Sequence, residues 1–445
     1  MAMPDKFKHR SVYHFTHLDN LPGILEHGLL STSENNRLGI KYDSIALSDI
    51  QGRRAAMPVT CGDGGVVHDY VPLYFCKRSS MLLYLVRNKI VDQQFIIYFE
   101  FPILIMNDYP SVFCDAAANT KMHPNFYSDF ADLEQLNWEA IGNLKWSMPN
   151  DRLKQERMAE LLIHRRIDKS SISKIIVWND SIKKYVLECY DEASIKAPPI
   201  GFDPIHYFID FYGSGKHTIV TGPYLTNKAY KETIDFVLQH IGKASNPKFN
   251  KLKDLKSALR ADLGCIPETA EIFGLESDNE MHPEDVGTHT LKVVEELRKL
   301  TVFKDMDSTD KLLVEIAAYL HDIGKGPKSR WAANKGKQKV DPDHPIKALP
   351  MLKRILTEDI AKMKPRSAKV ICKLVCYHDI VGDIVGKGRR VEELEEIVED
   401  ERELDMIIAL GKADMMSVNP TWGIIYDRKI SKLRETVMAK LESSD

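Results

Sequence analysis

The sequence predicts a multidomain protein in which an α+β domain is followed by an all-α domain. Its 445 residues exceed the roughly 100–200 residues of one ordinary domain. Strand-like runs alternate with helical spacing up to about residue 212, whereas amphipathic helical spacing prevails from about Asn227 onward. Between these patterns, Pro198-Pro199 and Gly213-Ser214-Gly215 favour a boundary near residue 213. We therefore expect a first domain, a helical linker region and a second domain at residues 1–212, 213–259 and 260–445.

Particular segments carry these assignments. Residues 95–106 and 173–178 are rich in Ile, Val and aromatic residues and are predicted strands. In the first domain, helical spacing of apolar residues predicts helices over residues 21–27 and 152–165. In the second domain the same spacing predicts four helices, over residues 286–297, 311–320, 368–377 and 392–414.

Composition excludes several other classes of protein. Apolar residues make up 44% of the chain and charged residues 28%, which argues against disorder. The longest apolar stretch is interrupted by Glu100 and Pro102 and is shorter than the roughly 18 residues that a membrane helix needs. The first twenty residues carry charges and lack the apolar block of a secretory signal. We expect a cytoplasmic protein without a membrane partner.

The cysteines and charges narrow the setting further. Seven scattered cysteines fit reduced thiols better than a disulfide framework. Cys372 and Cys376 have helical spacing in an apolar run, which favours buried helix residues over metal ligands. Basic residues number 23 against 26 acidic ones up to residue 212, and 38 against 38 afterwards. Any nucleic acid is therefore bound by local groups and not by an overall basic surface.

The second domain contains histidines and aspartates of the kinds that bind divalent metals. The doublet His321-Asp322 closes an apolar helix and is followed by Ile323-Gly324-Lys325-Gly326, a turn that we expect to leave room for a substrate. Lys325 is placed to contact a phosphate or, equally, to face solvent. A lone histidine on such a helix would more often be a core residue, but here several occur together: His289, His321, His344 and His378.

This pattern resembles the HD superfamily of metal-dependent phosphohydrolases. The segments 265–267, 281–284 and 288–290 are also similar to the HD domain attached to bacterial tRNA nucleotidyltransferases. The resemblance covers residues 260–420 and implies one divalent ion (Mn, Mg, Fe, Ni or Zn), with a second as in dinuclear members. The ligands that it implies are His289, His321, Asp322 and Asp414 for the first ion and His344 with His378 for the second.

Polar residues in the first domain form a second constellation. Alternation on a strand would point His14 and Thr16 to one face. An Arg53-Arg54 pair follows. Glu160 lies among apolar residues, where a carboxylate is uncommon because burying its charge costs free energy, and this placement indicates a functional role. Each has an ordinary alternative when taken singly: Thr16 as a cap, Arg54 as a surface charge and Glu160 on a solvated helix face.

Together these segments resemble the DarT family, toxins of the ADP-ribosyltransferase fold that modify DNA bases using NAD. The resemblance is carried by residues 13–21, the arginine pair, residues 68–82 and Ala159-Glu160, and it runs over residues 9–212. It implies that Arg54 and Glu160 are the catalytic residues. Because Arg53 adjoins Arg54, either member of the pair could be the catalytic arginine. It further implies NAD binding by four residues: His14, Thr16, Tyr74 and Arg78.

The implied chemistry favours single-stranded DNA as the acceptor. Cleavage of the nicotinamide bond develops positive charge on the ribose, which a nearby carboxylate stabilises. The base must reach that pocket unstacked. A cluster of basic residues near Glu160 could hold the strand or be a solvated helix face: Arg152, Lys154, Arg157, Arg165 and Arg166.

We therefore expect an NAD-dependent DNA ADP-ribosyltransferase joined to an HD phosphohydrolase. Thymidine is the first acceptor and guanosine the second, and an antitoxin is a further expected partner. Alternatives to this function remain open, both for the role of the first domain and for the acceptor. The first domain could be a non-catalytic module that binds NAD or nucleic acid beside a nucleotide phosphohydrolase, and RNA or protein could replace DNA as the acceptor.

Overall fold

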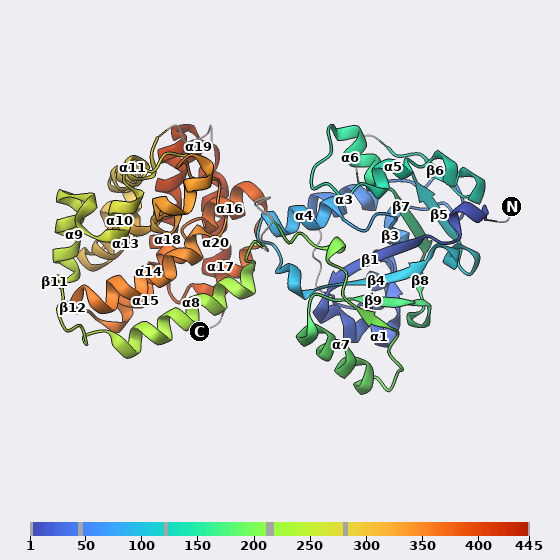
Figure 1. Ribbon diagram of the computed structural model, residues 1–445, viewed down its shortest axis with the longest axis horizontal. Helices are drawn as coiled ribbons and strands as arrows, with labels where there is room; N and C mark the ends of the chain where they lie inside the picture. The colour runs from blue at the N-terminus through green and yellow to red at the C-terminus, as the bar shows by residue number, and fades with distance from the viewer. Residues whose placement is uncertain (1–2, 43–47, 120–122, 211–217, 279–283, 444–445) are drawn as a thin grey trace. The chain divides into compact units, whose positions relative to one another are not determined.

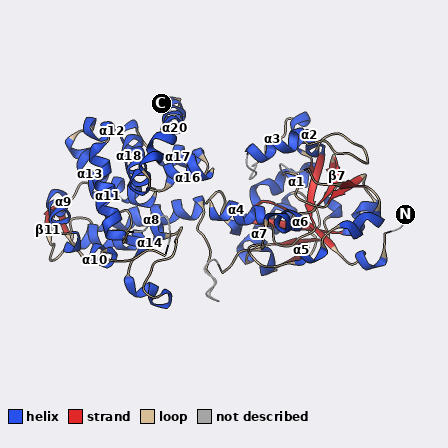
Figure 2. Ribbon diagram, turned by 90° about the horizontal axis from the view of Figure 1, so that it is seen from above, coloured by secondary structure: helices blue, strands red, loops and turns tan. Residues whose placement is uncertain are grey.

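The computed structural model describes residues 3–42, 48–119, 123–210, 218–278 and 284–443, and the chain forms two compact units (Figure 1). The first unit comprises Met1–Arg87 and Val91–Ile219, and the second comprises Asn88–Ile90 and Val220–Asp445. Strands gather in the first unit, and the second is almost wholly helical, which confirms the predicted fold class (Figure 2). The breaker run 213–215 and residues 281–283 of the HD resemblance lie outside the described residues.

An eight-stranded sheet forms the centre of the first unit, in the order β10-β9-β4-β1-β3-β7-β5-β6. Its strands are β1 Ser11–His17, β3 Tyr70–Tyr74, β4 Ile96–Pro102, β5 Ser111–Cys114, β6 Phe126–Tyr127, β7 Glu160–His164, β9 Lys174–Ile176 and β10 Ile200–Gly201. Two further strands, β2 Leu29–Leu30 and β8 Arg166–Ile167, form a separate antiparallel pair. The helices are α1 Leu21–His27, α2 Thr32–Leu38, α3 Ser48–Ala56, α4 Ser80–Arg87, α5 Trp138–Gly142, α6 Asp151–Arg157 and α7 Asp180–Glu192.

The strand predicted over residues 173–178 is confirmed as β9, and α1 is confirmed as well. The strand predicted over residues 95–106 is confirmed only as far as Pro102, because β4 ends there and Ile103–Asn107 forms a 3-10 helix. The helix predicted over residues 152–165 is wrong in its second half. Helix α6 ends at Arg157, and β7 begins at Glu160 between β3 and β5. A central strand is covered on both faces, so its continuous apolar run does not show the alternation that would have distinguished it from a helix.

Helices make up the second unit, apart from the short parallel pair β11 Phe249–Lys251 and β12 Ile360–Lys362. They are α8 Pro223–His240, α9 Leu252–Ala261, α10 Pro267–Ile272, α11 Val286–Lys299, α12 Thr301–Asp305, α13 Ser308–Leu320, α14 His344–Glu358, α15 Pro365–Cys376, α16 Ile380–Lys387, α17 Val391–Ile397, α18 Glu401–Val418, α19 Pro420–Ile425 and α20 Asp427–Glu442. The segment expected as a linker region contributes Val237, Leu255 and Leu259 to the core of this unit.

The single helix predicted over residues 392–414 is two helices in the structure. Helix α17 ends at Ile397 and α18 begins at Glu401, where the Asp400 carboxylate accepts a hydrogen bond from the Glu403 amide at 2.9 Å. A carboxylate in this position satisfies an amide that has no partner inside the helix. Apolar spacing continues across the break, and the cap therefore decides where the second helix starts.

The cysteines and the apolar character of the helices are the last general features of the chain. All seven cysteines are free, and Cys372 and Cys376 are buried on α15 as predicted. Among the described residues, no helix has the length and apolar character needed to cross a bilayer.

Candidate active site and candidate metal centre

A cavity of about 240 Å³ lies in the first unit against strands β1 and β3 and helices α1 and α3. Four of the predicted site residues line it: His14, Thr16, Arg54 and Tyr74. The predicted alternation explains part of this, because His14 and Thr16 are two residues apart on β1. The tertiary fold adds Arg54 from α3 and Tyr74 from the end of β3.

His14 and Thr16 are held in place by polar neighbours. The His14 Nδ1 lies 2.9 Å from the Pro72 carbonyl oxygen and donates to it, and Asn20 Nδ2 donates to Thr16 Oγ1 at 3.0 Å. Burial lowers the pKa of His14, against the opposing effect of its Pro72 hydrogen bond. The ring is therefore neutral at pH 7, and its Nε2 carries a lone pair.

Arg54 and Glu160 form a buried, two-pronged ion pair. Arg54 Nη1 donates to Glu160 Oε1 at 3.1 Å, and Nη2 donates to Oε2 at 3.0 Å. The Ala118 amide donates to Oε1 at 3.0 Å as well. Burial lowers the pKa of Arg54, but the charge and hydrogen bonds of Glu160 outweigh this effect and raise it above its ordinary value. The guanidinium is therefore held in its charged form.

Glu160 lies behind Arg54 and does not itself line the cavity. It begins β7, where it stands opposite Tyr74 of β3 and Cys114 of β5, and 1% of its surface is exposed. Arg54 contacts both the cavity and this carboxylate. A ligand in the cavity therefore meets the guanidinium before it can meet Glu160.

The structure separates Arg54 from its neighbour and places Arg78 elsewhere. Arg53 is exposed and donates to the Asn119 carbonyl at 2.8 Å, so Arg54 is the member of the pair that joins Glu160. Arg78 does not line the cavity. Its guanidinium donates to the carbonyl oxygens of Ile205 and Leu144, at 2.9 and 2.6 Å.

The basic cluster expected near Glu160 does not form a common surface. Arg157 is buried, and its guanidinium donates to the backbone carbonyls of Lys145 and Arg78, at 2.6 and 2.8 Å. Arg152 pairs with Glu156 on its own helix. Because the helix ends at Arg157, residues 165 and 166 belong to different elements and not to a continued helical face.

Four amide side chains that were not predicted as site residues also line the cavity: Asn20, Asn35, Gln51 and Asn119. Gln51 precedes Arg54 by one helical turn on α3, and this spacing is the signal that could have revealed it. Its Oε1 lies 2.8 Å from His68 Nε2. Asn119 follows the segment that contacts Glu160, and no sequence pattern marks it.

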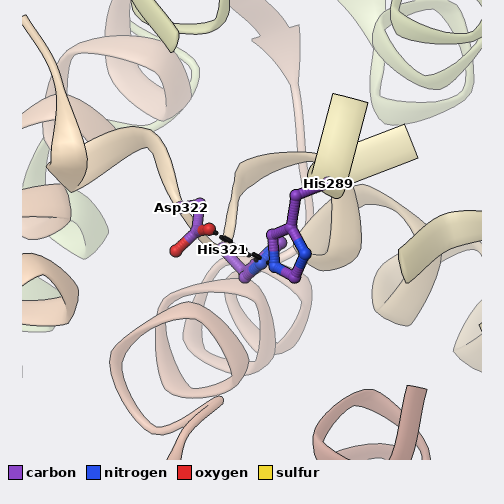
Figure 3. A group of neighbouring side chains, drawn as sticks. All are labelled: His289, His321 and Asp322. Carbon is purple, nitrogen blue, oxygen red and sulfur yellow. Dashed lines mark ion pairs between the residues drawn. The ribbon is translucent and has the colours of Figure 1, made fainter. Parts of the chain in front are cut away.

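In the second unit, His289, His321 and Asp322 point toward one another (Figure 3). His289 comes from α11, and His321 with Asp322 directly follows α13. Asp322 Oδ2 lies 3.3 Å from His321 Nε2 and 3.6 Å from His289 Nε2. Asp414 of α18 approaches the same nitrogen atoms, with its Oδ1 3.0 Å from His289 Nε2. The four ligands implied for the first ion are therefore together.

The other oxygen of Asp322 faces a second group of histidines. Its Oδ1 lies 3.1 Å from His344 Nε2 and 4.0 Å from His378 Nε2. Asp379 also belongs here, with its carboxylate 3.5 Å from His378 Nε2 and 3.7 Å from His344 Nε2. Sequence analysis did not select Asp379. The available signal was a second His-Asp doublet after an apolar helix, like His321-Asp322 after α13.

The donor atoms fit a divalent cation. Three imidazoles, of His321, His344 and His378, use Nδ1 to donate to a backbone carbonyl, at 2.8, 2.7 and 2.8 Å, so each directs Nε2 toward Asp322. Burial lowers the pKa of His321, but the charges of Asp322 and Asp414 outweigh this effect and raise it to about 9, so a cation that binds here would displace a proton from this nitrogen. The Nε2 atoms of His344 and His378 lie only 3.0 Å apart. His321 Nε2 and Asp322 Oδ1 are buried without a hydrogen-bond partner. Facing ring nitrogens and unpartnered buried atoms are what a cation would satisfy.

Charge at this centre also suits a cation. Burial raises the pKa of Asp414, but hydrogen bonding and charge from His289 and neighbouring histidines lower it to about 2. Burial likewise opposes ionisation of Asp322, and the charge of Lys325 and His321 holds its pKa well below the ordinary range. Both carboxylates are therefore ionised at pH 7.

The turn after the doublet is packed and does not leave room for a substrate, contrary to expectation. A Cβ on Gly324 would lie 1.9 Å from the carbonyl oxygen of His344, so glycine is needed for close approach to α14. Lys325 is not solvent-facing, because its Nζ lies 2.6 Å from Asp322 Oδ2.

Family models match both units. The model described as "ssDNA thymidine ADP-ribosyltransferase, DarT" matches residues 13–209, and the model described as "HD domain" matches residues 286–410.

Individual relatives agree with these matches. A "DNA ADP-ribosyl transferase" of Thermus sp. (strain 2.9) is 36% identical over 186 residues, which are 40% of this chain and 85% of the relative. A "Multifunctional CCA protein" of Vibrio campbellii is 40% identical over 73 residues, or 16% of either chain. The solved structure "Thermus sp. 2.9 DarT in complex with ADP-ribosylated ssDNA" has a TM-score of 0.42 and 30% identity, covering 47% of this chain and 99% of that chain.

Proposed function

Since the chain belongs to the DarT family of DNA ADP-ribosyltransferases, we propose that its first domain transfers ADP-ribose from NAD to thymidine in single-stranded DNA, with guanosine as the second acceptor. The buried Arg54–Glu160 pair at the wall of the cavity is the observation that carries this proposal. The guanidinium offers positive charge to the pyrophosphate of NAD, and the carboxylate directly behind it offers negative charge to the ribose once Arg54 turns away.

The residues of the cavity divide into two roles. His14, Thr16 and Tyr74 bind the nicotinamide-ribose side of NAD, and Arg54 holds its phosphate or stabilises charge on the base. As the glycosidic bond breaks, Glu160 stabilises the positive charge that develops on the ribose, and it accepts the proton of the attacking base. Because Arg54 covers Glu160, we further propose that the guanidinium turns from the carboxylate toward the NAD phosphates when NAD binds.

The second domain is, on this proposal, a metal-dependent phosphohydrolase. His289, His321, Asp322 and Asp414 would hold one divalent ion, and His344 and His378 would hold a second together with the other oxygen of Asp322. Such an ion, when bound, neutralises phosphate charge and lowers the pKa of water. We propose that this domain limits the modification by hydrolysing the pyrophosphate of ADP-ribosylated DNA, which releases AMP and leaves ribose phosphate on the base.

Replacement of one carboxylate tests the transferase. Glu160→Gln retains one of the two hydrogen bonds from Arg54, through its amide oxygen, but removes the charge and the base. Transfer of ADP-ribose to a thymidine-containing oligonucleotide, followed by mass spectrometry, should fall by about 100-fold or more. The same replacement at the exposed Glu139 should change nothing. Full transfer by Glu160→Gln would refute the catalytic role of this residue.

A second experiment tests the phosphohydrolase. Full-length Glu160→Gln protein with manganese should lower the mass of an ADP-ribosylated oligonucleotide by the mass of AMP less one water. The double variant Glu160→Gln/His321→Ala should leave the mass unchanged. An unchanged oligonucleotide mass in the first protein would eliminate the proposed substrate.

One observation favours the alternative of a non-catalytic first domain, namely that Glu160 does not reach the cavity. Under that reading, NAD binds to the wild type but Glu160→Ala leaves cell toxicity and any label transfer unchanged. Supplying RNA, protein and DNA with labelled NAD separates the acceptors. An antitoxin partner is tested by whether a co-expressed neighbouring gene product suppresses toxicity and purifies with the chain.

A further inference from the structure

A cavity of about 350 Å³ opens beside the metal centre of the second unit. His378, Asp379 and Asp414 line it, and so do Trp422 and Tyr426. Helix α16 begins next to Asp379 and leads along the cavity to Gly386, which lies beside Tyr426, so the metal-binding groups and the aromatic rings are at different ends. A molecule that fills this cavity therefore meets metal-binding groups at one end and aromatic rings at the other. The size is within the roughly 300–1,000 Å³ of ordinary small-molecule sites.

Trp422 lies on a short helix, and Tyr426 directly follows it, beyond the residues that the HD family model matches. That model ends at residue 410, whereas α19 spans Pro420–Ile425. Gly423 packs α19 close to α18, since a Cβ there would lie 2.7 Å from Met416 Cγ. Trp422 and Tyr426 are one helical turn apart, so both rings are presented on the same side.

The wall beside Tyr426 is kept open by glycine. Gly382 and Gly386 are one turn apart on α16, and both line the cavity. A Cβ at Gly386 would lie 3.8 Å from the Tyr426 hydroxyl, so a larger side chain would extend into the space in front of that ring. Lys429 Nζ lies 5.3 Å from the centroid of Tyr426 and donates to the Val385 carbonyl, which fixes the ring.

We propose that this cavity binds a nucleoside phosphate, with the phosphate at the metal centre and the base stacked on Trp422 and Tyr426. Aromatic rings bind bases of any sequence through their flat faces. Asp379 and Asp414 would repel a phosphate in the absence of a divalent cation, so binding requires the metal. The AMP half of an ADP-ribosyl group combines these two chemical features. The proposal rests on the phosphohydrolase function proposed above and adds its substrate class and specificity residues.

Calorimetric titration of the full-length protein tests this assignment. AMP, ribose 5-phosphate and inorganic phosphate are each titrated with manganese and with EDTA, and the metal-dependent part is compared. AMP should bind at least about tenfold more tightly than ribose 5-phosphate, because stacking of one base contributes that much. Metal-dependent binding of equal strength for both would overturn the proposal.

Variants at the far end of the cavity complete the test. Trp422→Leu should weaken AMP binding about tenfold, whereas Trp422→Phe should retain most of it and neither should change the binding of inorganic phosphate. Gly386→Leu should weaken AMP binding by filling the cavity. Manganese content, measured in every variant, should equal that of the wild type. If Trp422→Leu and Gly386→Leu bind AMP as tightly as the wild type does, the base site is refuted but the metal centre is not. If the wild-type protein binds no manganese, the metal centre is refuted as well.

Discussion

At the residue scale, two charged pairs decide what each site can do. Arg54 and Glu160 neutralise each other in the first unit, and Lys325 neutralises one oxygen of Asp322 in the second. In both pairs the cation contacts a carboxylate to which we assign a role at the site. Removing one partner of a buried pair leaves the other charge unpaired, which costs far more than a surface pair contributes.

The arginine doublet provides a direct comparison at this scale. Arg54→Ala should abolish ADP-ribose transfer and lower the free energy of unfolding of the first unit by about 3–5 kcal/mol, because Glu160 is left buried and unpaired. Arg53→Ala, in contrast, removes one exposed hydrogen bond and should change stability by less than about 0.5 kcal/mol. Urea denaturation and label transfer measure both effects. A greater loss in Arg53→Ala would contradict the assignment of the catalytic arginine.

His206 links the stability of the first unit to pH. It is fully buried between the rings of Tyr13 and Tyr98, and burial lowers its pKa to about 4. In the unfolded chain this histidine has its ordinary pKa of about 6.5 and is protonated below that pH. In the folded unit it is not protonated until the pH falls to about 4. Stability is therefore lost as the pH falls through this window.

His206→Phe isolates that effect from the other titrating groups. Between pH 7 and pH 5, the wild type should lose about 2 kcal/mol more of its free energy of unfolding than the variant does. Urea denaturation of both proteins at the two pH values gives the difference. Parallel losses would show that His206 is protonated equally in the folded and unfolded chains.

At the element scale, close approach between segments places the metal ligands. His344 begins α14, and the turn after Asp322 packs directly on that helix end because Gly324 has no side chain. Helical spacing in the sequence predicted α11, α13 and α15 correctly. It did not predict how close the turn comes to α14, since the two segments share no local pattern.

Gly324→Ala tests this packing. The added methyl would collide with the backbone of α14 and displace His344, so we expect a loss of about 1–3 kcal/mol in the stability of the second unit. Bound manganese, measured by mass spectrometry of the metal, should fall relative to the wild type. Gly142→Ala is the control, because a Cβ on Gly142 would have no atom within 4 Å. Normal metal content and stability in Gly324→Ala would refute the packing argument.

At the scale of the whole molecule, each unit has its own core and its own site. The hydrophobic clusters of the two units share no residue, and the cavity of each unit is lined from within that unit. Ligands that bind only the folded form stabilise the unit to which they bind. The two units should therefore respond to different ligands.

Calorimetric unfolding of the full chain with and without metal measures this separation. Manganese at 100 times its dissociation constant should stabilise the second unit by about 2.7 kcal/mol and raise one transition only, and EDTA should reverse the shift. His321→Ala should abolish the response. A metal-dependent shift of both transitions would show that the units unfold together.

The sequence by itself determined the order of the two folds and most of the residues with chemical roles. The resemblance to the HD superfamily implied the ligands His289, His321, Asp322 and Asp414, and the structure brings these four side chains together. The strand at Glu160, the grouping of Asp379 with His344 and His378, and the cavity that joins Asp414 to Trp422 and Tyr426 were decided only by the tertiary structure. Arg54 and Glu160 are 106 residues apart, and no local preference specifies that one side chain covers the other. Contacts of this kind depend on how strands and helices pack, which local spacing does not encode.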